Sequence, residues 1–599
     1  MSLILSRRDM DFLLFEWLDV EGLLARPRYA GHDVQTLSAV LDLAQSLAED
    51  LFAPHNKRSD SIEPVMRDDG GVDLPGEVKT ALDALSRSGL LAASQDVDIG
   101  GMQLPFVVDK AAFAWMQAAN AGTSGYALLT MAAANLLIAR GSPEQIECYA
   151  RPLLEGSCFG TMCLSEPQAG SSLADVRTRA LPEDDGSYRL FGNKMWISGG
   201  EHSLSHSITH LVLARVEGAL PGIKGLSLFI VPRDLPAGDG SSIRNDVVLA
   251  GLNHKMGQRG TVNTLLNFGE GASLPQGRPG AIGYIVGAEG EGLQAMFVMM
   301  NEARIAVGTS AAAIGYTGYL HALDYARSRP QGRLAGHKDA HAPQVPIVRH
   351  ADVRRMLLAQ KSYVEGALAL NLFCAKLVDE LRTGPPCEHA ATAQLLELLT
   401  PIAKSWPSQY CLEANNLAIQ VHGGYGYTRD YLVEQLYRDN RLNPIHEGTH
   451  GIQAIDLLGR KVVMAGGAAF GAYCDMILRS CARGSAVAGA DGDVQEHAAA
   501  VRELLEGVTA TTAILHAAGD TALCLANAAI YLELVGHLTI GWIWLEQLLA
   551  CTGKQGDFYH GKRAAAGYFL RWELPKTGPM MALLTSLDRT ALDVAPEWL

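Results

Sequence analysis

The first part of the chain repeats apolar residues at the spacing of helices. Between residues 36 and about 155, apolar side chains recur every three or four positions, which is the period of one helix face. Examples are Leu37, Leu41, Ala44 and Leu47. Clusters of Gly and Asp, as at residues 68–71, interrupt the repeat and mark loops. We predict a helical domain over residues 36–155, preceded by an apolar extension, residues 1–35, that packs on another part of the protein.

The pattern becomes strand-like near residue 156. Residues 188–191 and 194–198 flank Gly192 and Asn193, a pair that favours a two-residue hairpin turn. Three more runs are typical of strands, at residues 210–216, 226–231 and 262–268. We therefore predict a β domain over residues 156–275.

Helical spacing returns after that domain, and residues 276–460 are predicted to be helical. Leu293, Met296, Phe297 and Met300 recur on one helix face. Arg304 lies on the same stripe, and the small residues Gly308, Ala311 and Gly315 continue it. This strip has two interpretations: a surface that lets a ligand approach the backbone, or tight packing of one helix on another.

Residues 461–599 are predicted to form an added C-terminal helical domain. Its longest apolar stretch, residues 523–551, contains Asn527, Glu533, His537 and Glu546. A bilayer-spanning helix would carry these side chains at a high energetic cost. We interpret the stretch as one or two buried helices and expect no transmembrane segment.

Composition narrows the class of protein. The 599 residues are 48% hydrophobic and 19% charged, which favours several packed domains over disorder. The net charge of −15 disfavours nucleic acid and anionic membranes as partners. The ten cysteines form no Cys-x-x-Cys pair, which predicts no metal site and fits a reducing cytoplasm. The N-terminal apolar run is too short for a signal peptide.

Three segments carry candidate chemistry. Residues 163–172 read Cys-Leu-Ser-Glu-Pro-Gln-Ala-Gly-Ser-Ser, and such a loop binds an anion or a heterocycle edge, or is an ordinary turn. Residues 196–198 read Trp-Ile-Ser, where the Trp stacks on a planar cofactor or fills a core. Residues 446–449 read His-Glu-Gly-Thr, where Glu447 is a general base or a structural carboxylate near a helix N-terminus.

Together, and in this order, these segments resemble the acyl-CoA dehydrogenase family over about residues 40–460. Two further motifs belong to the resemblance: Lys-Met-Gly-Gln-Arg at 255–259 and Gln-Val-His-Gly-Gly-Tyr-Gly at 420–426. The resemblance implies a mainly α fold with a central β domain: a helical domain, a β-barrel-like domain and a four-helix domain, here with the added C-terminal helices.

The resemblance also implies FAD as cofactor and assigns the site residue by residue. Glu447 is implied as the catalytic base. The implied cofactor-binding residues are Met162, Leu164, Ser165, Gly170, Ser171, Trp196, Ile197, Ser198, Arg329, Gln420, Gly423, Gly424 and Thr449. The implied substrate-binding residues are Ser171, Asn301, Arg304 and Gly448. The chain departs from the family pattern at four places: Ser165 replaces Thr, Ser172 and Asn301 each replace Asp, and Gly451 replaces Gln.

The implied reaction is the α,β-dehydrogenation of an acyl-CoA thioester to the trans-2-enoyl-CoA, in fatty acid β-oxidation or related acyl-CoA catabolism. Glu447 removes the α-proton, and an electron-transferring flavoprotein accepts the electrons. Some relatives carry the base on the helix that here includes residues 308–315, but that stretch has no acid. Because Gln420 and Gly424 match residues that contact a neighbour's FAD, the resemblance implies at least a homodimer.

Other functions stay open at this point. The added domain resembles a longer bacterial branch that includes 3-methylmercaptopropionyl-CoA dehydrogenases and broad fatty acyl-CoA dehydrogenases. An acyl-CoA oxidase is an alternative, which the Ser-Glu-Pro segment disfavours, and a non-catalytic scaffold is disfavoured by the intact Glu447. No dinucleotide fingerprint follows a strand, so a nicotinamide enzyme is not supported.

Overall fold

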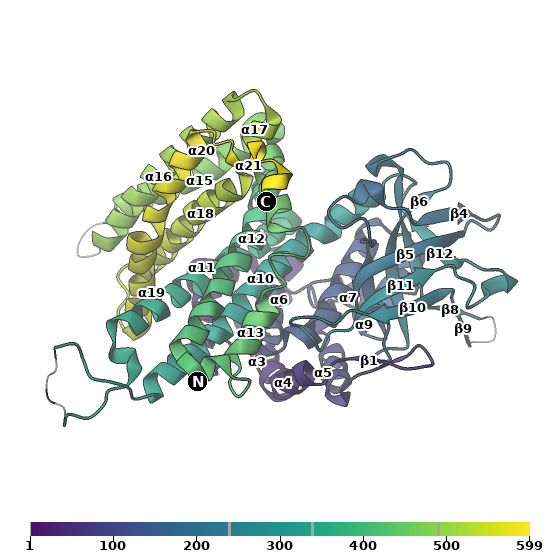
Figure 1. Ribbon diagram of the computed structural model, residues 1–599, viewed down its shortest axis with the longest axis horizontal. Helices are drawn as coiled ribbons and strands as arrows, with labels where there is room; N and C mark the ends of the chain where they lie inside the picture. Colours follow the sequence, from purple (N-terminus) through teal and green to yellow (C-terminus); the bar gives the residue numbers. More distant parts are fainter. Residues whose placement is uncertain (1, 238–240, 337–338, 340, 488–491) are drawn as a thin grey trace. The chain divides into compact units, whose positions relative to one another are not determined.

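The chain folds into two compact units that interleave along the sequence. The computed structural model describes residues 2–237, 241–336, 339, 341–487 and 492–599, without the side chains of 298–301 and 492 (Figure 1). The first unit, called here the sheet unit, consists of Gln35–Leu104 and Trp115–Ala303. The second, called the helical unit, consists of Met1–Val34, Pro105–Ala114 and Arg304–Leu599.

The sheet unit contains an eight-stranded sheet. Its strands are β3 (Cys158–Cys163), β4 (Arg179–Pro182), β5 (Tyr188–Ser198), β6 (Ser207–Val216), β7 (Leu226–Pro232), β10 (Val247–Leu252), β11 (Asn263–Phe268) and β12 (Ala281–Val286). The order is β10-β11-β5-β12-β7-β6-β3, and β4 pairs with β5 and β6. The β3–β6 and β4–β6 pairings are parallel and the others antiparallel. Strand β7 is buried at every position, as its continuous apolar run requires.

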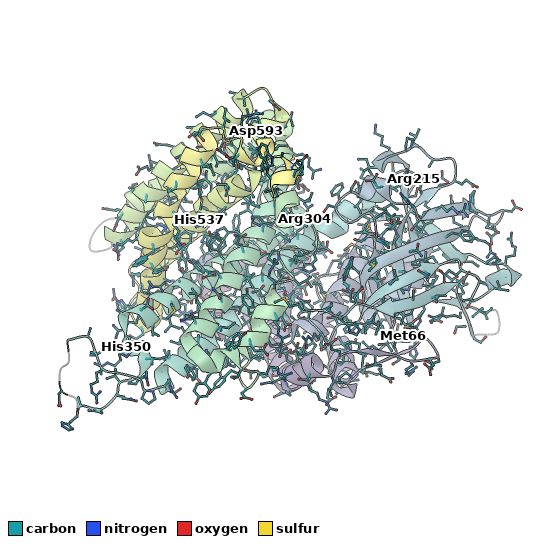
Figure 2. The ribbon with its side chains drawn as sticks, in the orientation of Figure 1. Met66, Arg215, Arg304, His350, His537 and Asp593 are labelled. Carbon is teal, nitrogen blue, oxygen red and sulfur yellow. The ribbon has the colours of Figure 1, made fainter. Side chains whose placement is uncertain are left out.

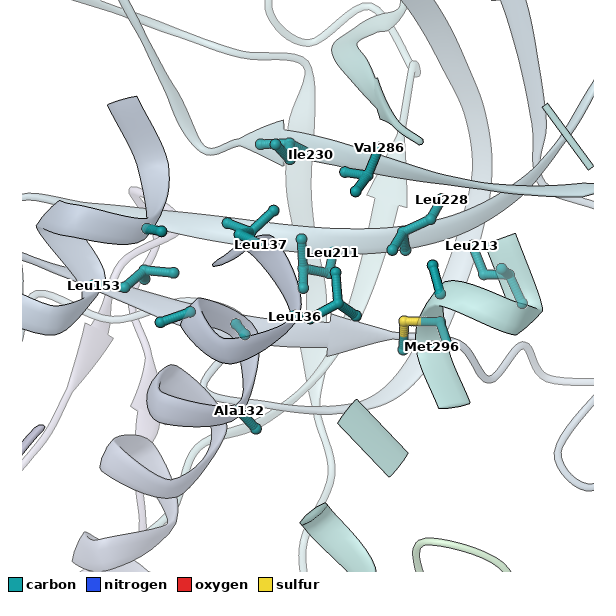
Figure 3. Packing of buried hydrophobic residues seen from close by; sticks show 14 of the residues in the cluster. Ala132, Leu136, Leu137, Leu153, Leu211, Leu213, Leu228, Ile230, Val286 and Met296 are labelled. Carbon is teal, nitrogen blue, oxygen red and sulfur yellow. The ribbon is translucent and has the colours of Figure 1, made fainter. Parts of the chain in front are cut away.

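Helices supply the rest of this unit. They are α3 (Val34–Leu47), α4 (Ala53–Ser61), α5 (Gly76–Arg87), α6 (Phe106–Ala119, from Trp115 on), α7 (Ala121–Arg140) and α9 (Arg151–Glu155). Helix α7 packs on the sheet through Leu136 and Leu137, which meet Leu211 of β6 and Leu228 of β7 in one buried cluster (Figure 3). Each such leucine contributes about 1.5–3 kcal/mol by leaving water, so this cluster anchors α7 to the sheet.

The predicted hairpin at Gly192 and Asn193 is wrong. Both residues lie inside β5, which runs unbroken from Tyr188 to Ser198. Gly192 has φ of 150°, and a Cβ there would lie 2.8 Å from the Cα of Thr178. The glycine therefore serves close packing against Thr178 and not a turn. The hairpin that does form joins β4 to β5, with Pro182 opposite Tyr188.

The helical unit is built around long helices. They are α10 (Gly292–Ser328, from Arg304 on), α11 (Ala351–Thr383), α12 (His389–His422), α13 (Val433–Asn440), α14 (His450–Asp456), α15 (Ala468–Ser485), α16 (Gly492–Ala517), α18 (Ala528–Cys551), α19 (Asp557–Tyr568) and α20 (Thr577–Thr585). Figure 1 shows α15, α16, α18 and α20 alongside one another. The chain is therefore mainly helical with a central β domain and added C-terminal helices, as predicted.

The strip of small residues on α10 serves helix packing. A Cβ on Gly308 would lie 2.0 Å from the Ala403 carbonyl oxygen, and one on Gly315 would lie 2.8 Å from the Cβ of Cys411. Both neighbours belong to α12, so the strip brings two helices together. Of the two interpretations of this strip, the structure supports packing and contradicts the open ligand surface.

The apolar stretch 523–551 lies mostly in α18. This helix and α7 are the two described helices that are long and apolar enough to cross a membrane by length and composition alone. A bent pair, residues 450–461 with 464–485, meets the same test if counted as one span. In the fold, 83% of the tested window of α18 is buried. Trp544 of α18 donates its indole N–H to the Ser362 carbonyl of α11, 3.1 Å away, so the added helices share a core with the rest of the unit.

The N-terminal extension packs on this same core, as predicted from its apolar residues. Phe12 lies edge-on to Phe558, with ring centroids 5.4 Å apart, and Trp17 stacks on Phe373. The hydroxyl of Tyr29 donates to the buried carboxylate of Asp379. The extension is thus part of the helical unit.

Candidate active site

Glu447 lies in a tight turn between α13 and α14. Its φ is 53°, and Gly448 follows with φ of 84°. Thr449 then begins α14 by accepting a hydrogen bond from the Ile452 N–H. A left-handed non-glycine residue costs on the order of 1–3 kcal/mol, and such strain is concentrated at functional sites. The sequence-predicted base is therefore held in a conformation that the surroundings must maintain.

Two side chains hold the backbone of this turn. Lys404 of α12 donates from Nζ to the Gly448 carbonyl oxygen, 2.8 Å away. Gln453 of α14 donates from Nε2 to the Glu447 carbonyl oxygen, 2.9 Å away. These bonds fix both peptide planes that follow Glu447. Neither donor was predicted from the sequence.

Charged groups surround the Glu447 carboxylate. The side chain is half-buried, and its oxygens make no hydrogen bond within the described part of the chain. Burial raises the pKa of Glu447, and the positive charges of Lys404 and Arg304 partly offset that rise. The pKa of Lys404 falls to about 7, chiefly because the side chain is buried; the charge of Glu447 opposes this fall and that of Arg304 adds to it. An unpaired carboxylate with a raised pKa is well suited to accept a proton near neutral pH.

Arg304 is fixed by a second acid. Figure 2 labels it on its helix, where its side chain is only 4% exposed and pairs with Asp456 of α14, 3.2 Å away. The other carboxylate oxygen of Asp456 accepts from Arg460. The structure thus places Arg304, a predicted substrate residue, in a buried ion pair whose positive charge acts on Glu447. The side chain of the predicted neighbour Asn301 lies outside the described part of the structure.

A chain of amides anchors the residue before Glu447. His446 contacts the Asn443 side-chain oxygen through Nε2, 3.1 Å away. Asn443 donates to Asn440, which donates in turn to Asn415 of α12, at 2.8 and 2.7 Å. Burial, and then the charge of Lys404, lowers the pKa of His446 to about 3, so this histidine is neutral. The asparagines, which sequence reasoning missed, are scattered over about thirty residues and form no short motif.

A buried ion pair holds the loop after β3 in the sheet unit. Glu166 accepts from Lys194 of β5 at 2.9 Å, and from the Thr178 hydroxyl at 2.6 Å. Burial alone would raise the pKa of Glu166, but Lys194 and these hydrogen bonds hold it at about 2. Lys194 also donates to the Leu164 carbonyl, and the Met195 N–H donates to the Ser165 carbonyl at 2.9 Å.

Trp196 projects from a bulge in β5. Its φ is 65°, its side chain is 59% exposed, and the pairing register with β11 shifts at this point. Ile197 is buried, and Ser198 accepts from the Asn263 amide at 3.1 Å. The bonds of Lys194 and Met195 therefore place Leu164 and Ser165 beside the end of β5 that carries Trp196 and Ser198. The other predicted cofactor residues of the sheet unit lie on β3 and the loop after it, where Met162 is half-buried and Gly170 and Ser171 are exposed.

A cavity in the helical unit is lined by three of the other predicted FAD-binding residues. It measures about 570 Å³ and is lined by Arg329, just after α10, and by Gly423 and Gly424, at the end of α12. A Cβ on either glycine would meet no atom within 4 Å, so their backbone is open. The Arg329 guanidinium lies 5.4 Å from the centre of the Tyr425 ring. Gln420 is exposed one turn earlier on α12 and is not among the lining residues.

Comparison with known proteins identifies the family. The sequence matches "Acyl-CoA dehydrogenase, middle domain" over residues 161–269 and "Acyl-CoA dehydrogenase, C-terminal domain" over residues 290–462. Residues 473–595 match "Acetyl-CoA dehydrogenase C-terminal like". The chain therefore belongs to the acyl-CoA dehydrogenase family and carries its additional C-terminal region, and it is an acyl-CoA dehydrogenase, which confirms the predicted resemblance.

Full-length relatives and solved structures agree. The chain is 36% identical to a 3-methylmercaptopropionyl-CoA dehydrogenase of Ruegeria pomeroyi, over 93% of each chain. It is 34% identical to a broad-specificity linear acyl-CoA dehydrogenase of Mycobacterium tuberculosis, over 98% of each chain. Caenorhabditis elegans ACDH-11 in complex with C11-CoA shares the fold with a TM-score of 0.75 at 18% identity, covering 96% of this chain and 94% of that one. An acyl-CoA dehydrogenase complexed with FAD from Bacillus anthracis has a TM-score of 0.74 at 18% identity, covering 98% and 95%.

Proposed function

We propose that this enzyme converts an acyl-CoA thioester to the trans-2-enoyl-CoA, with Glu447 taking the α-proton. The observation that carries this proposal is the Glu447 carboxylate itself, half-buried, without a hydrogen bond within the described residues, and facing two cations. A carboxylate that served only to cap a helix would accept backbone N–H bonds, and here Thr449 performs that role for α14.

The surroundings of Glu447 explain how it acts as a base. The α-proton of a thioester is only weakly acidic, so the base must be ionised before the substrate binds and must gain basicity from its environment. Burial supplies the basicity by raising the pKa of Glu447, and the charges of Lys404 and Arg304 limit the rise. A Cβ at position 448 would lie 2.4 Å from Nε2 of Gln453, so the turn has no room for a larger side chain than glycine next to the base.

The cofactor is proposed to be FAD, which accepts the hydride from the β-carbon when bound. Two features of the chain fit this group: the exposed Trp196 ring beside the Ser165 and Ser198 segments, and the cavity that joins Arg329 to open glycine backbone. A flavin ring stacks on an aromatic side chain, and an arginine pairs with a diphosphate. The Bacillus anthracis relative complexed with FAD supports the assignment. The proposed residues are Met162, Leu164, Ser165, Gly170, Ser171, Trp196, Ile197, Ser198, Arg329, Gln420, Gly423, Gly424 and Thr449.

Substrate and partners are proposed from the relatives. A linear fatty acyl-CoA and 3-methylmercaptopropionyl-CoA are the two candidate substrates, because proteins of those names are 34% and 36% identical to this chain. Ser171, Asn301, Arg304 and Gly448 are proposed to contact the substrate. We further propose an electron-transferring flavoprotein as acceptor, a homodimer, and a cytoplasmic location, which the ten free cysteines fit.

The proposal is tested by replacing Glu447 with Gln. The variant keeps the shape of the side chain and removes its basicity, so it should bind FAD and acyl-CoA and yet fail to bleach the flavin when mixed with substrate anaerobically. We expect the rate of bleaching to fall by at least roughly 10²–10⁴-fold. Glu503→Gln, at an exposed position of α16, is the control and should behave as wild type. Flavin reduction by Glu447→Gln at the wild-type rate would assign the base elsewhere.

A substrate screen would identify the acyl group. Saturated acyl-CoAs of increasing length and 3-methylmercaptopropionyl-CoA are compared by kcat/KM with an artificial electron acceptor. A clear preference for the methylthio substrate over the straight chain of equal length would assign the enzyme to sulfur metabolism. A preference that follows chain length alone would assign it to fatty acid β-oxidation.

A further inference from the structure

Lys404 is a buried cation in a stretch of α12 whose other buried residues are mostly apolar. Its side chain has no exposed surface, and the residues around it on the helix, Leu399, Ile402, Ala403 and Trp406, are equally buried. Removing an ammonium group from water costs several kcal/mol unless partners compensate. Lys404 donates to the Gly448 carbonyl at 2.8 Å, one residue after the base. A lysine buried at this cost beside the base is a candidate for a role in the reaction.

Several charged or titratable groups face Lys404. Glu447 and Arg304 are the two whose charges act on it. The charge of Lys404 acts in turn on His446 and His450, which burial keeps largely uncharged. Asp456 of α14 neutralises Arg304 through its ion pair. Since Arg304 is already paired, Lys404 is the cation left to balance Glu447.

We propose that Lys404 is a positioning residue for Glu447, which holds the turn through the Gly448 carbonyl and keeps the carboxylate ionised through its charge. This inference rests on the proposed function of Glu447 as the base. The first role is geometric: the left-handed pair of residues 447 and 448 needs external bonds to persist, and Lys404 supplies one of the two found. The second role is electrostatic, because an adjacent cation favours the charged form of a buried carboxylate.

Gln453 provides an internal control for these two roles. It donates to the Glu447 carbonyl just as Lys404 donates to the Gly448 carbonyl, but it carries no charge. Losing Gln453 should therefore loosen the turn without changing the ionisation of Glu447. Losing Lys404 should loosen the turn and also change the ionisation of Glu447.

The experiment measures the rate of anaerobic flavin reduction against pH for four FAD-loaded enzymes: wild type, Lys404→Met, Lys404→Arg and Gln453→Met. In Lys404→Met we expect a lower maximum rate. We also expect the acidic limb, the fall of the rate at low pH as Glu447 becomes protonated, to move to higher pH, because Glu447 without its cation holds its proton more tightly. Each unit of that move lowers the rate roughly tenfold at a pH below the limb. In Gln453→Met the maximum rate should fall while the acidic limb stays where it is.

Lys404→Arg keeps the positive charge but changes the geometry of the donor, and it can be measured if Lys404→Met loads no flavin. Its acidic limb should lie near the wild-type position. Its maximum rate should stay below wild type, because the larger guanidinium group cannot make the same hydrogen bond to the Gly448 carbonyl. A Lys404→Met enzyme with the wild-type rate and limb would overturn the inference, as would equal limb shifts in Lys404→Met and Gln453→Met. If Lys404→Met does not load flavin, Lys404→Arg decides alone. An acidic limb that lies one pH unit or more above its wild-type position in Lys404→Arg, which keeps the positive charge, would overturn the inference.

Glu447→Gln, measured in parallel, distinguishes failure of this inference from failure of the proposed function. If that variant is inactive while Lys404→Met behaves as wild type, Glu447 remains the base and only the role of Lys404 is wrong. If Glu447→Gln reduces flavin normally, the assignment of the base fails first.

Discussion

Lys194 and Glu166 form an ion pair of 2.9 Å in which the two side chains are 0% and 3% exposed. The pair joins strand β5 to the loop after β3, and Lys194 also holds the Leu164 carbonyl at 3.0 Å. Two segments proposed to border the flavin are therefore fixed to each other by one buried charge pair. Breaking such a pair from one side leaves an uncompensated charge in the interior.

Replacing Lys194 with Met should destabilise the fold by roughly 3–5 kcal/mol and reduce FAD retention, because Glu166 is left buried without its cation. Urea unfolding and the ratio of flavin to protein after gel filtration measure the two effects. Lys79→Met is the control, since Lys79 pairs with Asp83 at the surface and such pairs contribute roughly 1 kcal/mol or less. Equal losses in the two variants would contradict the structural role given to Lys194.

Replacing Trp196 with Ala should weaken FAD binding while leaving stability unchanged. The ring is 59% exposed, so its removal opens no cavity. Lost ring stacking of about 0.5–1.5 kcal/mol corresponds to roughly a 2- to 12-fold rise in the Kd of FAD. Reconstitution of the apoprotein followed by flavin fluorescence gives this constant. Trp598→Ala, at another exposed tryptophan, should leave the Kd unchanged.

Replacing Arg329 with Met should release FAD without dissociating the proposed homodimer. A charge-assisted bond to a diphosphate contributes roughly 1.5–3 kcal/mol, so the Kd of FAD should rise at least roughly tenfold. Arg589→Met, whose arginine pairs with Asp593 at the surface, is the control. Light scattering and flavin content are measured on the same samples, and an Arg329→Met enzyme that keeps wild-type FAD affinity would remove the cavity from the proposed site.

Because Arg329 lines the same cavity as Gly424, the two should serve one flavin, contributed across a dimer. Co-expression of Arg329→Met with Glu447→Gln should therefore restore activity, since in a mixed dimer one site has both an intact base and an intact cavity. Each variant alone should remain inactive. An inactive mixture that light scattering shows to contain mixed dimers would mean that base and cavity serve the same chain's flavin.

The electron acceptor is predicted to be a flavoprotein and not oxygen. Turnover with substrate in air and no added acceptor should be slow and yield little peroxide. Addition of an electron-transferring flavoprotein should restore rapid turnover, which is measured by the reduction of a terminal dye. Stoichiometric peroxide formation would instead favour an acyl-CoA oxidase.

The sequence predicts the class of the fold well because its signals are local. Apolar runs such as 226–231 become β7, and the 523–551 stretch becomes α17 (Thr521–Leu525) and α18. The hairpin at Gly192 failed because a glycine required by close packing against Thr178 has the same local signature as a turn. The five-domain division of the chain stays a prediction.

The same distinction between local and long-range signals applies to the candidate site. The prediction of Glu447 as the base comes from its short motif read together with the other family motifs, whereas the groups that shape its chemistry are distant in sequence. Lys404 lies on another helix, and its only signal is a lysine in an apolar stretch. Asn415 and Asn440 meet through a 2.7 Å bond that only the packing of α12 and α13 creates. Such long-range pairs cannot be read from one sequence.

The N-terminal extension depends on a residue that is synthesised very late. Asp9 pairs with Lys562 of α19, which also contacts Glu365 of α11 at 2.9 Å, and all three side chains are sealed from solvent. About 550 residues separate Asp9 from Lys562. At ribosomal speeds of about 5–20 residues per second, the extension waits on the order of half a minute to two minutes before its partner emerges. Trp17 and Tyr29 meet Phe373 and Asp379 earlier, but Asp9 and Phe12 lack their partners on α19 throughout that interval. A nascent chain of this enzyme is therefore a natural client for chaperones that cover exposed apolar segments.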